Sequence, residues 1–330
     1  MTRLLFDALT PKQARVAAVL FLEGRRRGVD LLITCREYMH LADMLRMYDV
    51  PHICFGRHGA TPREKLVFGL ERQMKLVEVA SDIDSMLSFP SPEAARVVFG
   101  LGKPIVTLND TPHAEHVNRL VLPLSETLIA PSAIPKEVWS VYCPRRVVQF
   151  DGVFEYMWVP RFTPDEEVVR RLGLRMGEYV VFRPEETRAA YYRWDFARLR
   201  QRLVEEFRRR GYTVVNVPRY PDQVMEGVIN LTEAVDHLQL AYFSAGVVTG
   251  GATMATEAAL LGVPALSYFP GDYYVDKYLQ RVGAPLFRCR NEESCLAMVD
   301  EVLKTGRGTA PKLEDPVSLI FETAVDVVTR

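Results

Sequence analysis

Polar and titratable side chains crowd into residues 109–119, directly after the predicted strand 105–108. Two histidines, two carboxylates, two asparagines and an arginine fall within this stretch, a density that acid–base catalysis or sugar binding requires. A polar, capped start of a surface helix is the alternative. Because H-E-x-x-H is absent and only the two histidines offer metal-ligand spacing, no metal site is expected. The expected catalytic residues are Asp110, His113 and Glu115. The expected substrate-binding residues in this stretch are Asn118 and Arg119.

A second candidate lies at residues 247–267, which read as a strand, a glycine turn, a helix and another strand. Gly250 and Gly251 let the backbone approach a ligand without a Cβ clash. The N-terminus of the following helix presents N–H groups and partial positive charge. We expect this turn, with Thr253, to bind a diphosphate and Glu257 to contact a ribose; a plain turn capped by Thr253 is the alternative. Neither G-x-G-x-x-G nor a Walker A loop is present, so dinucleotide and P-loop readings find no support.

Two further positions follow predicted strands. Arg183 ends strand 180–183, where its guanidinium can pair with phosphate oxygens, unless it forms an interdomain salt bridge. His58 lies in the loop 56–59, which we expect to close over the substrate. The aromatic pairs 191–192 and 273–274 are weaker candidates for flanking a base or a sugar, with core packing as the alternative.

Strand and helix signals alternate along the whole chain, which predicts βαβ units and parallel sheets. The length of 330 residues suggests two domains. One short internal repeat indicates two similar halves. The Arg-rich helix ends 25–28 and 208–211 are each followed, after a glycine, by a segment rich in strand-forming residues. We expect an N-terminal Rossmann-like acceptor or sugar domain, a C-terminal nucleotide-binding domain and a final helix that crosses back; their residues are 1–155, 156–313 and 314–330.

The composition narrows the class of protein. A net charge of −1 argues against a nucleic-acid-binding role. Five cysteines without C-x-x-C make a disulfide framework or zinc site unexpected, and Cys289 and Cys295 are expected to be small buried hydrophobes. No apolar stretch is long enough to span a membrane, and a cytoplasmic location is expected. Many arginines and prolines with few amides suit a thermophilic source, although a GC-rich genome gives the same arginine bias.

The chain resembles the mainly archaeal DUF354 family. The resemblance covers most of the chain and is carried by five segments: 56–59, 91–96, 109–115, 133–137 and 250–267. That family belongs with GT-B-type proteins, alongside glycosyltransferases and UDP-N-acetylglucosamine 2-epimerase. The resemblance implies an α/β, GT-B-like fold in which two Rossmann-like, doubly wound domains face a cleft and the C-terminal helix returns to the first domain.

The resemblance also assigns roles to single residues. In GT-B proteins the glycine turn of the second domain binds the nucleotide diphosphate, which matches Gly250, Gly251 and Thr253, and acidic and basic contacts match Glu257 and Arg183. The 2-epimerases carry Pro-Glu-Glu-x-Asn-Arg, and residues 114–119 here read Ala-Glu-His-Val-Asn-Arg, so three of the motif's residues match. Where the family tends to place a histidine after the first strand, this chain has Thr-Pro-Lys-Gln at 10–13.

Together these observations predict an enzyme that acts on a nucleotide sugar, with glycosyl transfer slightly favoured. A 2-epimerase-like isomerase and a non-catalytic nucleotide-sugar-binding protein are the alternatives. The nucleotide sugar, with UDP as the expected nucleotide, is the substrate, and no separate cofactor is expected. The sequence leaves a homodimer open.

Overall fold

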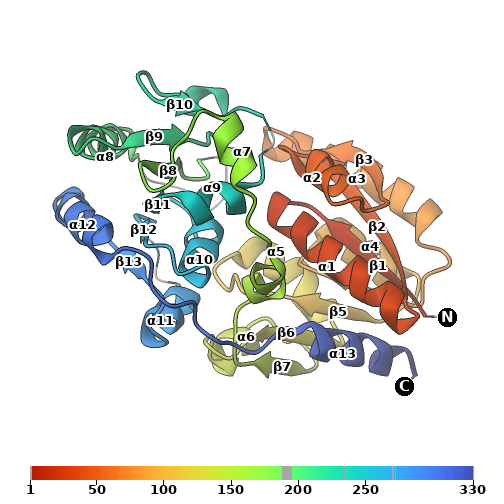
Figure 1. Cartoon of the computed structure of the whole chain (residues 1–330). Helices are drawn as coiled ribbons and strands as arrows, with labels where there is room; N and C mark the ends of the chain where they lie inside the picture. The colour runs from red at the N-terminus through yellow and green to blue at the C-terminus, as the bar shows by residue number, and fades with distance from the viewer. Residues whose placement is uncertain (1, 188–194, 234, 270, 272, 330) are drawn as a thin grey trace. The chain divides into compact units, whose positions relative to one another are not determined.

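The computed structural model describes residues 2–187, 195–233, 235–269, 271 and 273–329. The chain divides into two compact units. Unit 1 comprises Met1–Trp158 and Leu313–Arg330, and unit 2 comprises Val159–Lys312. Each unit is a parallel sheet covered by helices, which is the GT-B-like, doubly wound α/β architecture (Figure 1).

Unit 1 is built on a seven-stranded sheet of order β3-β2-β1-β4-β5-β6-β7, with every described pairing parallel. The order reverses between β1 and β4, so the loops that follow these two strands flank the topological switch point, where open α/β sheets bind ligands. The strands, in chain order, are β1 Arg3–Ala8, β2 Asp30–Glu37, β3 Ile53–Arg57, β4 Ser85–Ser88, β5 Ile105–Leu108, β6 Thr127–Pro131 and β7 Val147–Phe150.

Helices form two contacting groups in unit 1. In one group α1 contacts α2 and the C-terminal α13, and in the other α3 contacts α4, which contacts α5. Apolar residues of β1, β4 and β5 pack with those of the second group. The helices are α1 Pro11–Arg27, α2 Leu41–Met47, α3 Pro62–Val79, α4 Pro92–Gly100, α5 Glu115–Val121, α6 Lys136–Ser140 and α13 Val317–Thr329, with short 3₁₀ turns η1 Leu122–Leu124 and η2 Phe154–Met157.

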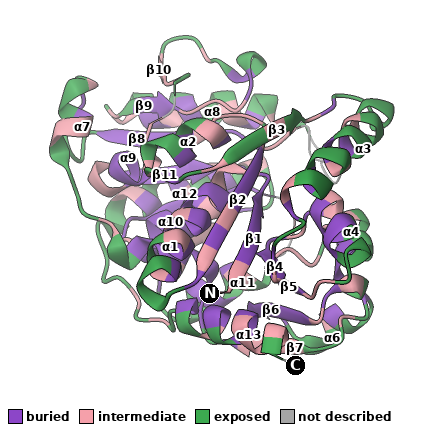
Figure 2. Ribbon diagram, turned by 90° about the vertical axis from the view of Figure 1, so that its right-hand side faces the viewer, coloured by how far each residue is buried: buried purple, intermediate pink, exposed green. Residues whose placement is uncertain are grey.

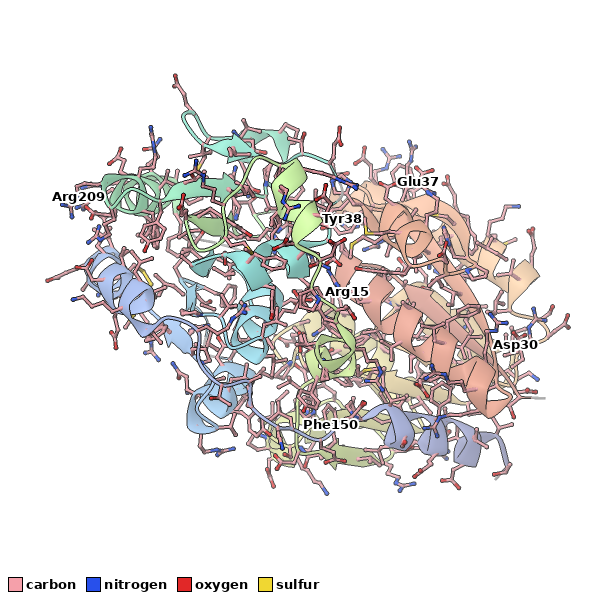
Figure 3. The ribbon with its side chains drawn as sticks, viewed as in Figure 1. Arg15, Asp30, Glu37, Tyr38, Phe150 and Arg209 are labelled. Carbon is pink, nitrogen blue, oxygen red and sulfur yellow. A yellow bond between two sulfur atoms is a disulfide. The ribbon has the colours of Figure 1, made fainter. Side chains whose placement is uncertain are left out.

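The last helix belongs to unit 1, as the resemblance implied. Helix α13 contacts β4, β5 and α1, and Arg27 of α1 lies over the ring of Phe321 at 5.4 Å. Near the end of β7, the ring of Phe150, labelled in Figure 3, packs against Phe154 of η2 at 5.1 Å. The start and the end of the sequence therefore share one core.

Unit 2 has a six-stranded parallel sheet of order β10-β9-β8-β11-β12-β13, with its switch point between β8 and β11. Its strands are β8 Tyr179–Arg183, β9 Thr213–Asn216, β10 Ile229–Asn230, β11 Gly246–Thr249, β12 Ala265–Ser267 and β13 Leu286–Arg288. Its helices are α7 Glu166–Arg171, α8 Ala197–Arg209, α9 His237–Phe243, α10 Thr253–Leu260, α11 Tyr274–Arg281 and α12 Glu292–Thr305, with η3 Val159–Arg161 and η4 Pro221–Gln223. Helices α8 and α12 contact each other and contribute to the main core of the unit.

Purple, buried strands run through the interior in Figure 2, because strands covered on both faces are apolar along their length. Among the described residues no helix is both long and apolar enough to cross a membrane.

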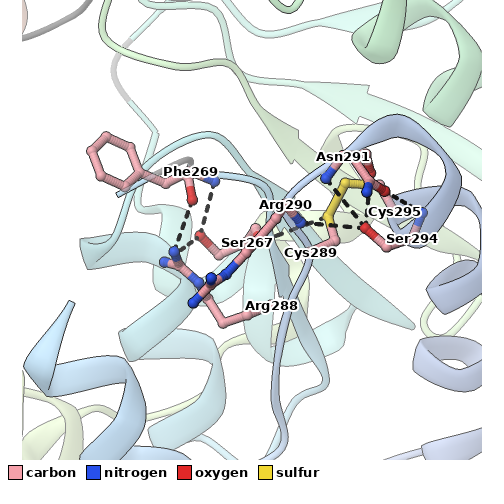
Figure 4. Close-up of a disulfide and its surroundings, with 8 residues drawn as sticks. All are labelled: Ser267, Phe269, Arg288, Cys289, Arg290, Asn291, Ser294 and Cys295. Carbon is pink, nitrogen blue, oxygen red and sulfur yellow. Dashed lines mark hydrogen bonds between the residues drawn. A yellow bond between two sulfur atoms is a disulfide. The ribbon is translucent and has the colours of Figure 1, made fainter. Parts of the chain in front are cut away.

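The expectation for the two late cysteines was wrong. Cys289 and Cys295 are buried, but they form a disulfide across the start of α12 (Figure 4). Asn291 caps this helix, and the turn around it brings the two Cα atoms to 5.0 Å, within the range that a disulfide spans. Cysteine number and C-x-x-C spacing carry no information on such a turn, which is why the sequence did not reveal the bond.

Candidate functional site

In unit 2 the glycine turn lies at the switch point, between the ends of β8 and β11. The amide of Gly250 donates to the carbonyl of Arg183 at 3.0 Å, and the amide of Gly251 donates to Oγ1 of Thr249 at 3.0 Å. Helix α10 then begins at Thr253. Its N-cap residue is Ala252, and no side chain caps the helix, so Thr253 is not the cap. A helix start of this kind presents N–H groups and partial positive charge.

The two glycines are required for different reasons. A Cβ on Gly250 would lie 2.5 Å from Cβ of Glu185 and 2.8 Å from the ring of Tyr268, so the turn could not approach β8 so closely. A Cβ on Gly251 would lie 3.1 Å from Nη2 of Arg219 and 3.6 Å from Oγ1 of Thr249, the latter an ordinary van der Waals distance. Gly250 therefore serves the packing of the turn, whereas Gly251 keeps its outer surface open beside a guanidinium.

Two arginines lie close to this turn. Arg183, at the end of β8, donates from Nη1 to the carbonyls of Val217 and Pro218 at 2.8 and 3.2 Å. Arg219 donates from Nε to the carbonyl of Pro184 at 3.1 Å, and its Nη1 lies 3.7 Å from Glu186. The predicted arginine thus holds the loop after β9. The arginine next to Gly251 is the one that sequence reasoning missed, and its position just after strand β9 was the available signal.

Below the turn, Glu185 is buried and fixed in place. Its Oε2 accepts from the hydroxyl of Tyr268 at 2.8 Å, and its other oxygen pairs with Arg200. Its backbone carbonyl accepts from Gln223 at 2.8 Å. Buried charges are tolerated when they are paired and hydrogen-bonded. The paired Glu185 side chain is therefore held in place, and Gly250 packs directly against it.

Glu257 is fully buried inside α10, and its Oε2 lies 2.8 Å from Nε2 of His237, the first residue of α9. The role expected for this carboxylate was contact with a ribose. The structure places it against an imidazole that remains partly exposed.

In unit 1 a cluster of charged side chains lies beside the switch point. Lys12, in the first turn of α1, forms ion pairs with Asp110, which follows β5, and with Glu155 of η2; the Lys12–Glu155 distance is 2.8 Å. The ammonium also lies 5.5 Å from the ring of Phe89, just after β4. Lys12 and Asp110 are partly exposed, and Glu155 is almost completely buried. We call Lys12, Asp110 and Glu155 the lysine cluster.

Burial and charge act on this cluster in opposite senses. Burial raises the pKa of Glu155 to about 7; Lys12 opposes this shift and Asp110 adds to it. Burial by itself would lower the pKa of Lys12, but the two carboxylates outweigh burial and raise it. Within the described part of the chain, Oε2 of Glu155 has no hydrogen-bond partner. The cluster can therefore hold a proton on a carboxyl group near neutral pH.

The remaining residues of 109–119 divide into two groups. Asn118 is buried, accepts from the side chain of Asn109 at 2.8 Å and donates to the carbonyls of Thr111 and Pro112, so it shapes the loop that presents Asp110. Glu115 and Arg119 pair with each other at 2.6 Å on the exposed surface of α5. His113 is exposed in the turn before α5, two residues before the helix begins at Glu115. Of the three predicted catalytic residues, only Asp110 belongs to the lysine cluster.

At the end of β1 a buried ion pair supports the same sheet edge. Asp7 accepts from Nη1 of Arg72 at 2.9 Å and from the hydroxyls of Thr34 and Ser91, each at 2.6 Å. These residues are almost completely buried, which favours a structural role. His58, in the loop after β3, contacts the ring of Tyr38 edge-on at 5.1 Å.

The described residues contain no group of three or more His, Cys, Asp or Glu side chains placed to hold a metal ion. The tyrosine pair 191–192 lies outside the described residues. Of the second pair, Tyr273 stacks on Phe269 at 4.5 Å, so it packs against a neighbouring aromatic ring.

Comparison with known proteins agrees with this architecture. Residues 15–329 match the family described as protein of unknown function DUF354. An uncharacterized protein of Methanocaldococcus jannaschii is 29% identical over 317 residues, which cover 92% of each chain.

Solved structures share the fold at low sequence identity. The UDP-GlcNAc 2-epimerase of M. jannaschii, in complex with UDP-GlcNAc and UDP, aligns with a TM-score of 0.77 at 13% identity, over 98% of this chain and 100% of that one. The Anabaena protein HepE, in complex with UDP and glucose, aligns with a TM-score of 0.61 at 15% identity, over 100% and 97% of the two chains. At these identities the likeness shows the fold alone.

Proposed function

Because the chain belongs to the DUF354 family and has the GT-B-like fold, we propose that it is a nucleotide-sugar-dependent enzyme that binds a nucleotide diphosphate at the glycine turn of unit 2. One observation carries the proposal: an N-terminus of α10 without a side-chain cap lies behind two glycines at the switch point of the sheet. Main-chain N–H groups and the helix dipole at such a place favour a diphosphate.

The residues of unit 2 take distinct roles in this proposal. The first N–H groups of α10, from Thr253 on, are proposed to bind the diphosphate. Gly250 and Gly251, whose own amides are used within the turn, let the ligand approach the helix. Arg219, beside Gly251, pairs with a phosphate oxygen, and Arg183 acts by holding the loop that carries Arg219. Glu257 acts through His237, whose exposed edge is proposed to contact the ribose.

The lysine cluster of unit 1 is proposed to supply the acid–base chemistry of the reaction. In glycosyl transfer Asp110 takes the proton of the acceptor hydroxyl, the acceptor oxygen bonds to the sugar C1, and the C1–O bond to the diphosphate breaks. The positive end of α10 stabilises the leaving diphosphate. His113, Glu115, Arg119 and His58 are proposed as sugar or acceptor contacts, and Asn118 as the residue that fixes their loop.

Epimerisation is the second candidate, because the lysine cluster places two carboxyl groups with different surroundings around one ammonium. Such a pair suits removal of a proton from a sugar carbon and its return on the other face. The favoured base in that reaction is Asp110, and the favoured acid is Glu155.

One experiment separates these reactions. The protein is incubated with UDP-GlcNAc in D₂O, with and without acceptor sugars, and followed by NMR. Deuterium at the sugar C2 indicates epimerisation, whereas release of UDP only with an acceptor indicates transfer. Binding with neither change, in every nucleotide sugar tried, would contradict an enzymatic function and leave a nucleotide-sugar-binding protein.

A further inference from the structure

Apolar side chains gather on the outer surface of one helical layer of unit 1. Sixteen large hydrophobic residues of the described chain are exposed, and half of them lie on or next to α3, α4 and α5. The rest are scattered. These eight residues, here called the α3 face, are Leu66, Val67, Leu70, Met74, Val77, Phe99, Leu101 and Leu120.

The α3 face spans three neighbouring helices. Helix α3 contacts α4, which contacts α5, and Figure 2 shows exposed, green stretches on both α3 and α4. The opposite side of α3 is already used, because Gly69, Arg72 and Leu76 are buried toward the sheet. Helix α3 is therefore packed on one side and exposes apolar side chains on the other, whereas a surface helix usually turns a polar face to solvent.

The spacing on α3 is that of a helix pair. Val67, Leu70, Met74 and Val77 are separated by three, four and three residues, the alternation that forms a seam between two helices. This pattern favours another helix as the occupant over an extended peptide or a small molecule.

We infer that the α3 face joins two copies of this chain around a two-fold axis close to Leu70, with α3 of each copy antiparallel to α3 of the other. Charge fits this arrangement. Arg63 and Glu78 are exposed at opposite ends of the apolar stripe, and Glu78 pairs with Lys75 of its own helix at 3.1 Å. An antiparallel neighbour brings its Arg63 to the same carboxylate at both ends. A two-fold interface must be complementary to itself in this way.

The exposure of these side chains also favours an interface. The eight side chains are between 37% and 69% exposed and lie on one helical layer. Large hydrophobic residues that gather in this way on a surface mark interaction sites, whereas single scattered ones do not.

Sedimentation velocity of the full chain over a range of concentrations tests the inference. Wild type is expected to sediment as a dimer, and Leu70→Glu is expected to weaken dimerisation at least tenfold. Leu22→Glu is the matched control, since Leu22 of α1 and Leu70 are the same residue type and both 55% exposed. A monomeric wild type, or a dimer that survives Leu70→Glu, overturns the inference.

A second variant guards against misfolding of Leu70→Glu. In a background with Cys54→Ser and Cys143→Ser, Leu70→Cys puts two thiols near the proposed axis, whereas Leu22→Cys does not. Mild oxidation should give a covalent dimer for the first variant only. Equal cross-linking of both, or of neither, contradicts the proposed axis. Neither measurement depends on nucleotide binding, so the dimer and the proposed function can fail separately.

Discussion

At the scale of single residues, the lysine cluster is the least ordinary feature of the protein. A partly buried ammonium lies between two carboxylates at the edge of the first sheet. Replacing a whole buried ion pair with apolar groups is often neutral, but removing one partner leaves an uncompensated charge. The cluster should therefore respond very differently to single and to paired substitutions.

Lys12→Met should lower the free energy of unfolding by about 3 kcal/mol, at the low end for a broken buried ion pair because Glu155 can take up a proton. Urea denaturation at pH 7 measures this loss. Lys12→Met combined with Glu155→Gln should lose less, since one of the two stranded carboxylates is then neutral. Arg145→Met, which breaks an exposed pair with Glu126, should cost less than about 1 kcal/mol. Equal losses for Lys12→Met and Arg145→Met would contradict the buried pairing.

The raised pKa of Glu155 predicts a specific pH dependence. The ordinary value is 4.5 and the folded-state pKa is about 7, so the folded protein binds this proton more tightly than the unfolded chain does. The resulting stability is fully present below pH 4.5 and is lost as the pH rises through 7. The stability of wild type relative to Glu155→Gln should therefore decline across this window.

Urea denaturation of both proteins at a series of pH values measures that decline. Glu126→Gln, at an exposed carboxylate, is the control for general charge effects. A difference between wild type and Glu155→Gln that stays constant from pH 4.5 to 8 would show that Glu155 has an ordinary pKa.

Residue roles were harder to predict from sequence than residue positions. The many polar and titratable side chains after the predicted strand 105–108 indicated a site at residues 109–119. The structure does place Asp110 at a sheet edge. Lys12 and Glu155 lie 98 and 45 residues away from Asp110 in the chain, and only the crossing of strands brings them to it. The motif likeness at 114–119 likewise could not reveal that Asn118 is turned inward while Glu115 and Arg119 pair on the surface.

At the scale of elements, long periodic segments were predictable and short ones were not. The glycine turn, its flanking strands and α10 lie where the pattern of residues 247–267 predicted them. In that segment β-branched residues mark the first strand, glycines mark the turn, and helix-forming residues mark the helix. Strand β10, only two residues long, went unpredicted because it has too few residues to show alternation. Helix α5 does not follow β5 directly but starts at Glu115, since the Asn118 side chain holds the preceding turn.

The two glycines of the turn offer a matched test at this scale. Gly250→Ala should destabilise the protein by about 1–3 kcal/mol, because its Cβ would overlap the backbone and Cβ of Glu185. Gly251→Ala should cost much less, because the atom it meets is the end of the flexible Arg219 side chain. Thermal unfolding of both variants measures the difference. Similar losses at the two positions would contradict the packing described for the turn.

At the scale of the whole molecule, the two halves repeat one plan. Each is a parallel sheet with one switch point, and the Arg-rich helix ends near 28 and 211 both pass through a glycine with positive φ, 69° and 85°. Alternating strand and helix signals were enough to predict this duplication. The disulfide was not predictable, because it depends on the capped turn at the start of α12, which brings two thiols six residues apart into bonding distance.

Nucleotide binding by isothermal titration calorimetry tests the central claim most directly. Wild type is titrated with UDP, GDP, CDP, dTDP and UDP-GlcNAc, alongside Arg219→Ala and Arg210→Ala. The two arginines are matched in exposure, 21% and 20%, but only Arg219 lies beside the glycine turn. We predict saturable binding of at least one of these nucleotides, weakened at least tenfold, or about 1.4 kcal/mol, in Arg219→Ala and unchanged in Arg210→Ala. No binding of any nucleotide to wild type, or equal weakening in both variants, would contradict a diphosphate site at this turn.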